Sequence, residues 1–320
     1  MSPRRYRSIC VAALALLAII VVSGAGVRLT GSGLGCDDWP NCNDEQLIDV
    51  SSKHAAIEQI NRLFTGLVAL GVMIAVLGSM LREPRRRDLT RLSWGLVAGV
   101  VGQILLGGFT VLVDLHPAAV QAHFVLSMVL IANAVVLVSR AGVPDRVTVP
   151  RVNVPIRRHV WAITIATAIV ILLGTVVTGS GPHAGDEDAR RFGFAIHRVV
   201  QLHSIAVWVA VAVVAGLLFR LRSRRDDREV LDGVIVAWIC VAVLQGGVGY
   251  LQYFTEIPAA LVAVHIALAT ALWGITVWMV EVMRGPSSDQ RLHELGGLVD
   301  DRREEPADVA DEVSEGAGGR

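Results

Sequence analysis

Eight long apolar stretches, separated by short charged segments, constrain this chain more than any other feature of its sequence. Each is roughly 18 to 25 residues long, the length that an α-helix needs to cross the hydrocarbon core of a bilayer. They cover residues 9–27, 57–80, 92–113, 118–139, 159–178, 197–219, 231–254 and 258–282. At 53% hydrophobic residues, the chain of 320 residues is too apolar for a soluble domain of this size. The sequence therefore predicts an all-α polytopic membrane protein.

Basic residues are distributed unevenly between the connecting segments. Three alternate connections hold five arginines each: Arg82, Arg85, Arg86, Arg87 and Arg91; Arg140, Arg146, Arg151, Arg157 and Arg158; Arg220, Arg222, Arg224, Arg225 and Arg228. Arginine-rich loops stay on the cytoplasmic side of a membrane, so both termini are predicted to be cytoplasmic. Residues 1–8 then form a cytoplasmic N-terminal segment. The polar, acidic residues 283–320 are expected to be a disordered cytoplasmic tail.

One short sequence motif occurs twice, about half the chain apart. Leu29–Gly33 reads LTGSG after the first apolar stretch, and Val177–Gly181 reads VTGSG after the fifth. Four crossings return a chain to its starting side, so the two halves align as parallel repeats. The sequence predicts two pseudo-symmetric four-helix bundles, residues 9–139 and 159–282, joined by a cytoplasmic linker at 140–158.

Polar residues occupy matching positions inside the two halves. His123 and His265 lie early in the fourth and eighth stretches, while Asn61 and His203 align in the second and sixth. Histidine within a membrane is costly without a partner. Each could bond to a neighbouring backbone or hydroxyl group, but imidazoles on facing helices of a bundle are what bis-histidine haem ligation requires. The repeat favours haem, with His203 preferred over the more superficial His197.

Further polar side chains lie near the predicted outer face. Glu58 is either an ordinary first-turn acid, paired with Arg62 one turn later, or a carboxylate that relays protons beside a haem pocket. Arg28 and Arg62 are candidates to pair with haem propionates. Cys36 and Cys42 lie in the first outer loop, where an oxidising exterior favours a disulfide. That pair is either a structural staple, which is favoured, or a redox-active pair.

The segment Arg28–Cys42, RLTGSGLGCDDWPNC, resembles the first-loop motif of the haem A synthase family of eight-helix membrane enzymes. Ile57–Arg62 resembles the family's helix-two motif, Glu-x-x-His-Arg. The resemblance extends over about residues 10–282. A composition rich in Ala, Val, Gly and Arg and poor in Lys is typical of a GC-rich bacterial genome, and the resemblance implies a bacterial plasma membrane.

The resemblance implies oxidation of a ring methyl of haem O to the formyl group of haem A, through successive hydroxylations. It implies a haem b cofactor between His203 and His265, and a substrate site around His123 and the helix-two position. It assigns the catalytic role to Glu58 and the outer cysteine pair to Cys36 and Cys42. Haem O and haem O synthase are the expected partners, a homo-oligomer is compatible with the pattern, and no nucleic-acid binding is expected.

One position departs from the family pattern, because Asn61 stands where many members have histidine. Three outcomes stay open: five-coordinate substrate iron on His123, a substitute ligand such as His54, or loss of activity. The first is favoured, since an open iron position is compatible with oxidative chemistry. Two other functions also stay open, a non-enzymatic haem carrier and a b-type cytochrome passing electrons from quinol. The sequence specifies neither the electron acceptor nor the oxygen source.

Overall fold

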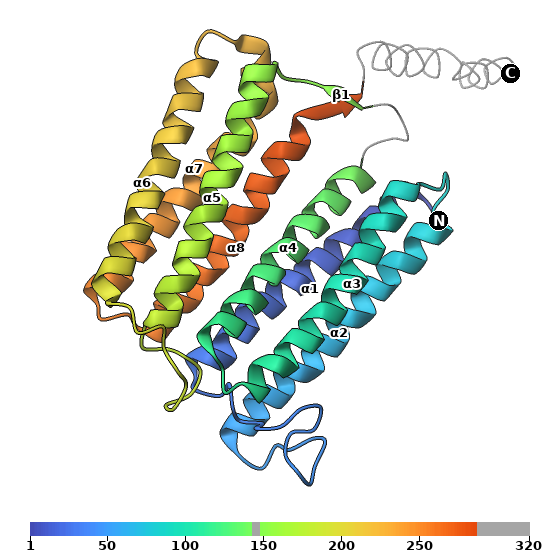
Figure 1. Ribbon diagram of the computed structural model, residues 1–320. Coiled ribbons are helices and arrows are strands. Elements are labelled where there is room, and N and C mark those ends of the chain that lie inside the picture. The colour runs from blue at the N-terminus through green and yellow to red at the C-terminus, as the bar shows by residue number, and fades with distance from the viewer. Residues whose placement is uncertain (143–147, 287–320) are drawn as a thin grey trace, which may run out of the picture.

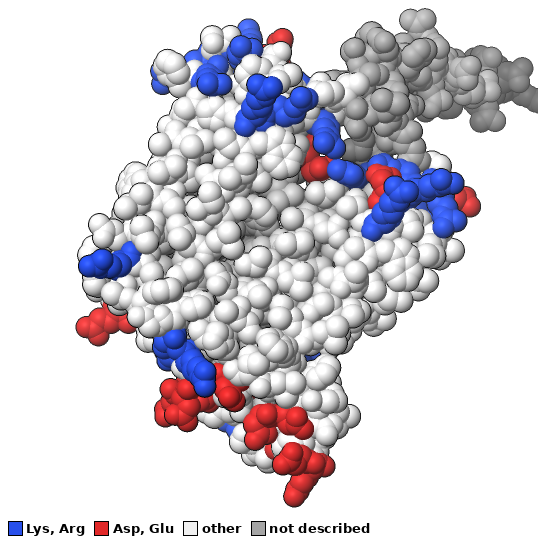
Figure 2. All heavy atoms as spheres, in the orientation of Figure 1, with Lys and Arg blue, Asp and Glu red and all other residues white. Residues whose placement is uncertain are grey.

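The computed structural model describes residues 1–142 and 148–286 and is built from eight long helices (Figure 1). Their bounds are α1 Pro3–Leu29, α2 Lys53–Leu81, α3 Arg87–Leu112, α4 Pro117–Ala141, α5 Val154–Ser180, α6 Ile196–Leu221, α7 Arg225–Phe254 and α8 Ala259–Val282. All eight are long and apolar enough to cross a membrane. On the face seen in Figure 2, an uncharged band separates two charged ends. The predicted fold class is confirmed.

Most helices begin earlier than the apolar stretches predict. Helix α1 begins at Pro3 rather than residue 9, and α7 begins at Arg225 rather than residue 231. Ser2 caps α1 by accepting the Arg5 amide, and a proline in the first turn suits that position. The predicted N-terminal segment 1–8 is therefore mostly helical, because hydropathy marks the membrane core whereas backbone hydrogen bonding continues through the charged turn.

The helices pack as two groups of four (Figure 1). In the first group α1 and α3 each contact both α2 and α4, so α2 and α4 lie diagonally across the bundle. Helices α5 to α8 repeat this arrangement, although α6 and α7 touch much less than α2 and α3 do. Each group has its own apolar core, one around Leu96 and Ile131 and the other around Ile163 and Leu217.

Helix α8 joins the two groups by packing against α1 and α4. The Trp273 indole N–H donates to the Met128 carbonyl at 2.8 Å, and the Arg140 guanidinium pairs with Glu281 at 3.1 Å. Both contacts join α4 to α8. The halves are thus held side by side by polar contacts as well as by apolar packing, which suits association where lipid competes for apolar surfaces.

A small antiparallel hairpin was not predicted. Strand β1 (Thr148–Pro150) pairs with β2 (Arg284–Pro286), and Pro150 lies opposite Arg284. The pairing of β1 with β2 therefore orders part of the predicted linker 140–158 and the start of the predicted tail at 283. Strands of three residues, each ending in proline, carry no detectable period-two pattern. The rest of the predicted tail, residues 287–320, lies outside the described residues.

Candidate functional site

The four matching polar residues each face a glycine on the preceding helix. The pairs are Asn61 with Gly24, His123 with Gly107, His203 with Gly174 and His265 with Gly249. A Cβ atom added to Gly107, Gly174 or Gly249 would lie 3.2 Å from the Cε1 atom of its histidine. The glycines therefore make room for imidazole rings between adjacent helices.

None of the three histidine rings makes a hydrogen bond within the described part of the chain. The Nδ1 atoms of His123, His203 and His265 are enclosed without a partner, whereas the Nε2 atoms are not enclosed. The carbonyls of Val170 and Gln245 lie near the His203 and His265 rings without hydrogen-bond geometry. Each carbonyl is one turn before the corresponding glycine. Among the described residues, the Nε2 atom of each ring therefore has no hydrogen-bond partner and is not enclosed.

The donor set fits a haem better than a small metal ion. Helices α6 and α8 are diagonal in their bundle, and each carries one of these imidazoles. Among residues 1–142 and 148–286 there is no cluster of three or more His, Cys, Asp or Glu side chains that could hold a metal ion. Two imidazoles without accompanying carboxylates or thiolates are typical of axial haem ligation. His197, by contrast, lies exposed in the first turn of α6.

The first half has an amide where the second has an imidazole. The Ser23 hydroxyl donates to Asn61 Oδ1 at 2.8 Å, which fixes the side chain against α1. The Asn61 amide NH₂ has no hydrogen-bond partner among the described residues. His54, the alternative ligand, is exposed at the start of α2, where its Nδ1 bonds to the Ser32 hydroxyl at 2.9 Å. Among the described residues of the first half, the arrangement supports His123 as the imidazole at this depth.

Glu58 is buried one turn from Asn61, with 6% of its surface exposed. Its Oε1 accepts two bonds from the Arg62 guanidinium, at 2.7 Å from Nη2 and 3.1 Å from Nε. Its Oε2 accepts the Cys36 backbone N–H at 2.9 Å. The pair with Arg62 that belongs to the ordinary interpretation of Glu58 is present, and the carboxylate is in addition enclosed and held by the Cys36 amide.

Arg62 also connects α2 to the first outer loop by hydrogen bonds. Its Nη1 donates to the Asn41 carbonyl at 3.0 Å, and its Nη2 donates to the Asp38 carbonyl at 3.2 Å. The guanidinium is thus engaged by the protein itself. Arg28 is different, since its side chain makes no hydrogen bond or ion pair within the described ranges and lies near another cation, Arg191. Of the two arginines predicted for propionates, Arg28 is the one left available.

Cys36 and Cys42 form the predicted disulfide, with an S–S distance of 2.00 Å. Sequence reasoning missed what the loop between them contacts. The Trp39 ring covers Gly108 so closely that an added Cβ would lie 2.5 Å from it. Gly108 follows Gly107, the residue against which His123 packs. The loop therefore connects Glu58 on α2 with the α3 surface beside His123.

The outer loop of the second half covers the outer end of the first. The Gly33 N–H donates to the Gly185 carbonyl at 2.8 Å, and a Cβ on Gly185 would lie 3.1 Å from Arg28 Cγ. Leu115 packs with Ala184 beneath this contact. Arg191, in the same loop, was not singled out by sequence because nothing local marks it. The first half is thus capped by loops from both halves.

Comparison with known proteins identifies the family of this chain. Residues 7–277 match the model of a family described as cytochrome oxidase assembly protein (COX15-CtaA). A heme A synthase of Bacillus mycoides strain KBAB4 is 26% identical over 278 residues, covering 83% of this chain and 89% of the relative. A heme A synthase of Lysinibacillus sphaericus strain C3-41 is 25% identical over 310 residues, covering 91% of this chain and 100% of the relative. The family match spans all eight helices and the site built from them, so the chain belongs to the haem A synthase family.

Proposed function

We propose that this protein oxidises a ring methyl of haem O to the formyl group of haem A. The observation that supports this best is the broken symmetry of the two halves. Glu58 is a buried carboxylate beside the Asn61 and His123 positions, whereas the repeat-equivalent residue next to His203 is Val200. Within residues 1–142 and 148–286, only the first half therefore combines a single imidazole with a group able to take protons, as oxidation of a methyl carbon requires.

In the second half, His203 and His265 would hold a haem b through their Nε2 atoms. This assignment is supported by two observations: the rings have no hydrogen-bond partner among the described residues, and they lie on diagonal helices. When bound, such a haem supplies electron transfer. The chain's own contribution there is to fix the two rings, which it does by seating each against a glycine of the neighbouring helix.

In the first half, His123 would hold the iron of the substrate haem, with Asn61 placed on the diagonal helix. Glu58 would take up protons released as the methyl group is oxidised, with the electrons passing to an acceptor outside this chain, while Arg62 and the Cys36 amide keep that carboxylate oriented. Arg28 would pair with a propionate at the outer end. Trp39 and the disulfide loop would exclude water from this side of the bundle.

The charge distribution supports the bacterial plasma membrane and cytoplasmic termini. On the face in Figure 2, Lys and Arg gather mostly at the end that carries the N-terminus and the end of α8 in Figure 1, and Asp and Glu mostly at the opposite end. The site then lies near the outer face. Haem O synthase is the expected supplier of substrate, because haem O is a membrane-soluble product that one membrane enzyme must pass to the next.

The direct test is co-expression of the full chain with a source of haem O, followed by extraction and chromatography of the pigments. We expect haem A to accumulate only when both are present. Bound haem O with no haem A would identify a carrier instead. Bound haem b alone, reducible by quinol, would identify a cytochrome. Either of these results would overturn the proposed reaction.

The Asn61 position gives a spectroscopic prediction. If His123 is the single protein ligand of substrate iron, Asn61→His should convert that haem to a six-coordinate, low-spin form and suppress its binding of carbon monoxide. Absorption and electron paramagnetic resonance spectra of the purified, loaded protein measure both changes. Asn61→Ala is the matched control and should leave carbon monoxide binding intact. A wild-type substrate haem that is already low-spin, and that becomes high-spin in His54→Ala, would assign the second ligand to His54.

A further inference from the structure

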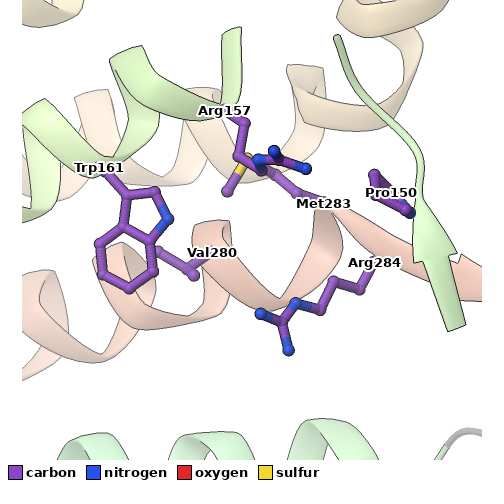
Figure 3. Close-up of a pocket in the computed structure, with 6 residues that line it drawn as sticks. All are labelled: Pro150, Arg157, Trp161, Val280, Met283 and Arg284. Carbon is purple, nitrogen blue, oxygen red and sulfur yellow. The ribbon is translucent and has the colours of Figure 1, made fainter. Parts of the chain in front are cut away.

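A pocket lies at the end of the bundles that carries the N-terminus and the end of α8, far from the histidines in the fold (Figures 1 and 3). Its volume is about 310 Å³. Helix α5 contributes one wall, the end of α8 another, and the β1–β2 hairpin closes the side. The lining residues are Pro150, Arg157, Trp161, Val280, Met283 and Arg284.

The hairpin holds this pocket in shape. Pro150 lies opposite Arg284 in the antiparallel pair, and the Arg151 amide donates to the Met283 carbonyl at 2.8 Å. Arg157 and Trp161 are one helical turn apart and therefore project from the same face of α5. Met283, with 2% of its surface exposed, belongs to the buried core beneath. The two arginines are thus presented by ordered elements around an apolar base.

The pocket carries positive charge that no described carboxylate balances. Within residues 1–142 and 148–286, neither Arg157 nor Arg284 makes a side-chain hydrogen bond or ion pair. Two carboxylates on adjoining elements are engaged elsewhere. Asp227 accepts two bonds from Asn153, each at 2.9 Å, and Glu281 pairs with Arg140. Unpaired guanidinium groups near one another favour a shared anionic ligand.

The remaining surface of the pocket is apolar and faces the membrane boundary. The Trp161 side chain is 46% exposed, about two turns inside the start of α5, a depth at which tryptophan anchors helices in the headgroup region. Figure 3 shows the indole of Trp161 and the two guanidinium groups around the same space. A ligand with a phosphate and an adjoining hydrocarbon chain matches both parts, whereas a free phosphate matches only one.

We propose that this pocket binds the headgroup of an anionic phospholipid, with the phosphate between Arg157 and Arg284 and an acyl chain along Trp161 and Val280. Basic pockets between helices at a membrane face are typical binding sites for anionic lipids. The site is independent of the haem chemistry, because no lining residue belongs to the Glu58 or histidine clusters. It would tie the hairpin, and with it the connection between the two halves, to the lipid surface.

The test measures lipid retained by the purified full chain, using native mass spectrometry in detergent with added phosphatidylglycerol or phosphatidylcholine. We expect wild type to retain phosphatidylglycerol selectively. The double variant Arg157→Gln/Arg284→Gln should bind it roughly thirtyfold more weakly, given what each arginine contributes near an anionic surface. Arg225→Gln is the matched control, since this arginine is also at a helix start but its side chain is 92% exposed. It should bind phosphatidylglycerol as wild type does.

Two further measurements distinguish a lipid from free phosphate and test the contribution of Trp161. Inorganic phosphate at millimolar concentration should not displace the lipid, and Trp161→Ala should weaken lipid binding while leaving the arginines in place. Equal retention by the double variant and wild type would overturn the proposal. Displacement by inorganic phosphate alone would also overturn it, in favour of a soluble anion. Haem content should be the same in all variants, which would show that any loss of lipid is not a loss of folding.

Discussion

His203→Ala and His265→Ala are each expected to remove the b-type haem from the purified protein. The two rings lie on diagonal helices, and neither makes a hydrogen bond among the described residues. Loss of one ring removes an axial ligand outright. We expect haem occupancy to fall by more than about tenfold, because even loss of an indirect partner of a metal ligand costs that much. The measurement is the reduced-minus-oxidised spectrum per mole of protein.

His197→Ala is the matched control, since His197 lies on the same helix but is exposed. Its spectrum should be unchanged. Added imidazole should partly restore the low-spin spectrum of His203→Ala, because the space beside Gly174 is then free to hold a small ligand. A His203→Ala variant with a full b-type spectrum, combined with loss of the spectrum in His197→Ala, would reverse the assignment of these two residues.

The second large effect is expected at Glu58. Glu58→Gln keeps the size of the side chain and an oxygen that can accept the Cys36 amide, but it removes the proton acceptor and the charge that faces Arg62. Removal of a general base typically costs about 10²- to 10⁴-fold in rate. We therefore expect haem A formation to fall to the background while bound haem O and haem b persist. Pigment extraction after timed incubation with haem O measures this.

Two variants separate the chemical role of Glu58 from its role in holding the loop. Glu58→Asp keeps a carboxylate and should retain part of the activity. Glu45→Gln removes an exposed acid of the same loop and should have no effect. Full activity in Glu58→Gln would exclude Glu58 as the base. Loss of bound haem in that variant would instead point to a positioning role through Arg62 and the Asp38–Asn41 backbone.

Some residue predictions depended on contacts close in sequence, and these agree with the structure. Glu58 and Arg62 are one helical turn apart, so their ion pair follows from helix geometry alone. Cys36 and Cys42 are separated by 6 positions, and their disulfide closes a short loop. Arg62 shows the limit of this reasoning. Its spacing from Glu58 is evident in the sequence. Its bonds to the Asp38 and Asn41 carbonyls depend on how the loop folds back, and they use the guanidinium group that was predicted to pair with a propionate.

Other features depended on contacts far apart in the chain and had no local sign. Trp39 reaches Gly108 across the first bundle, and Gly185 of the second half closes over Gly33 and Arg28 of the first. The hairpin that builds the Arg157 and Arg284 pocket joins residues from the middle and the end of the described chain. Each of these pairings is set by the packing of whole helices, which hydropathy does not encode.

The sequence by itself determined the eight membrane crossings, their division into two repeats and the equivalence of Asn61, His123, His203 and His265. These follow from local physics, because a bilayer requires each crossing to satisfy its own backbone and makes every buried polar side chain conspicuous. Only the tertiary structure decided that the histidine rings sit against glycines without partners, that Glu58 is enclosed by the disulfide loop, and that Arg28 rather than Arg62 is left available. Those outcomes depend on which helices pack together and on how the loops return over them, and such long-range contacts are formed only in the folded chain.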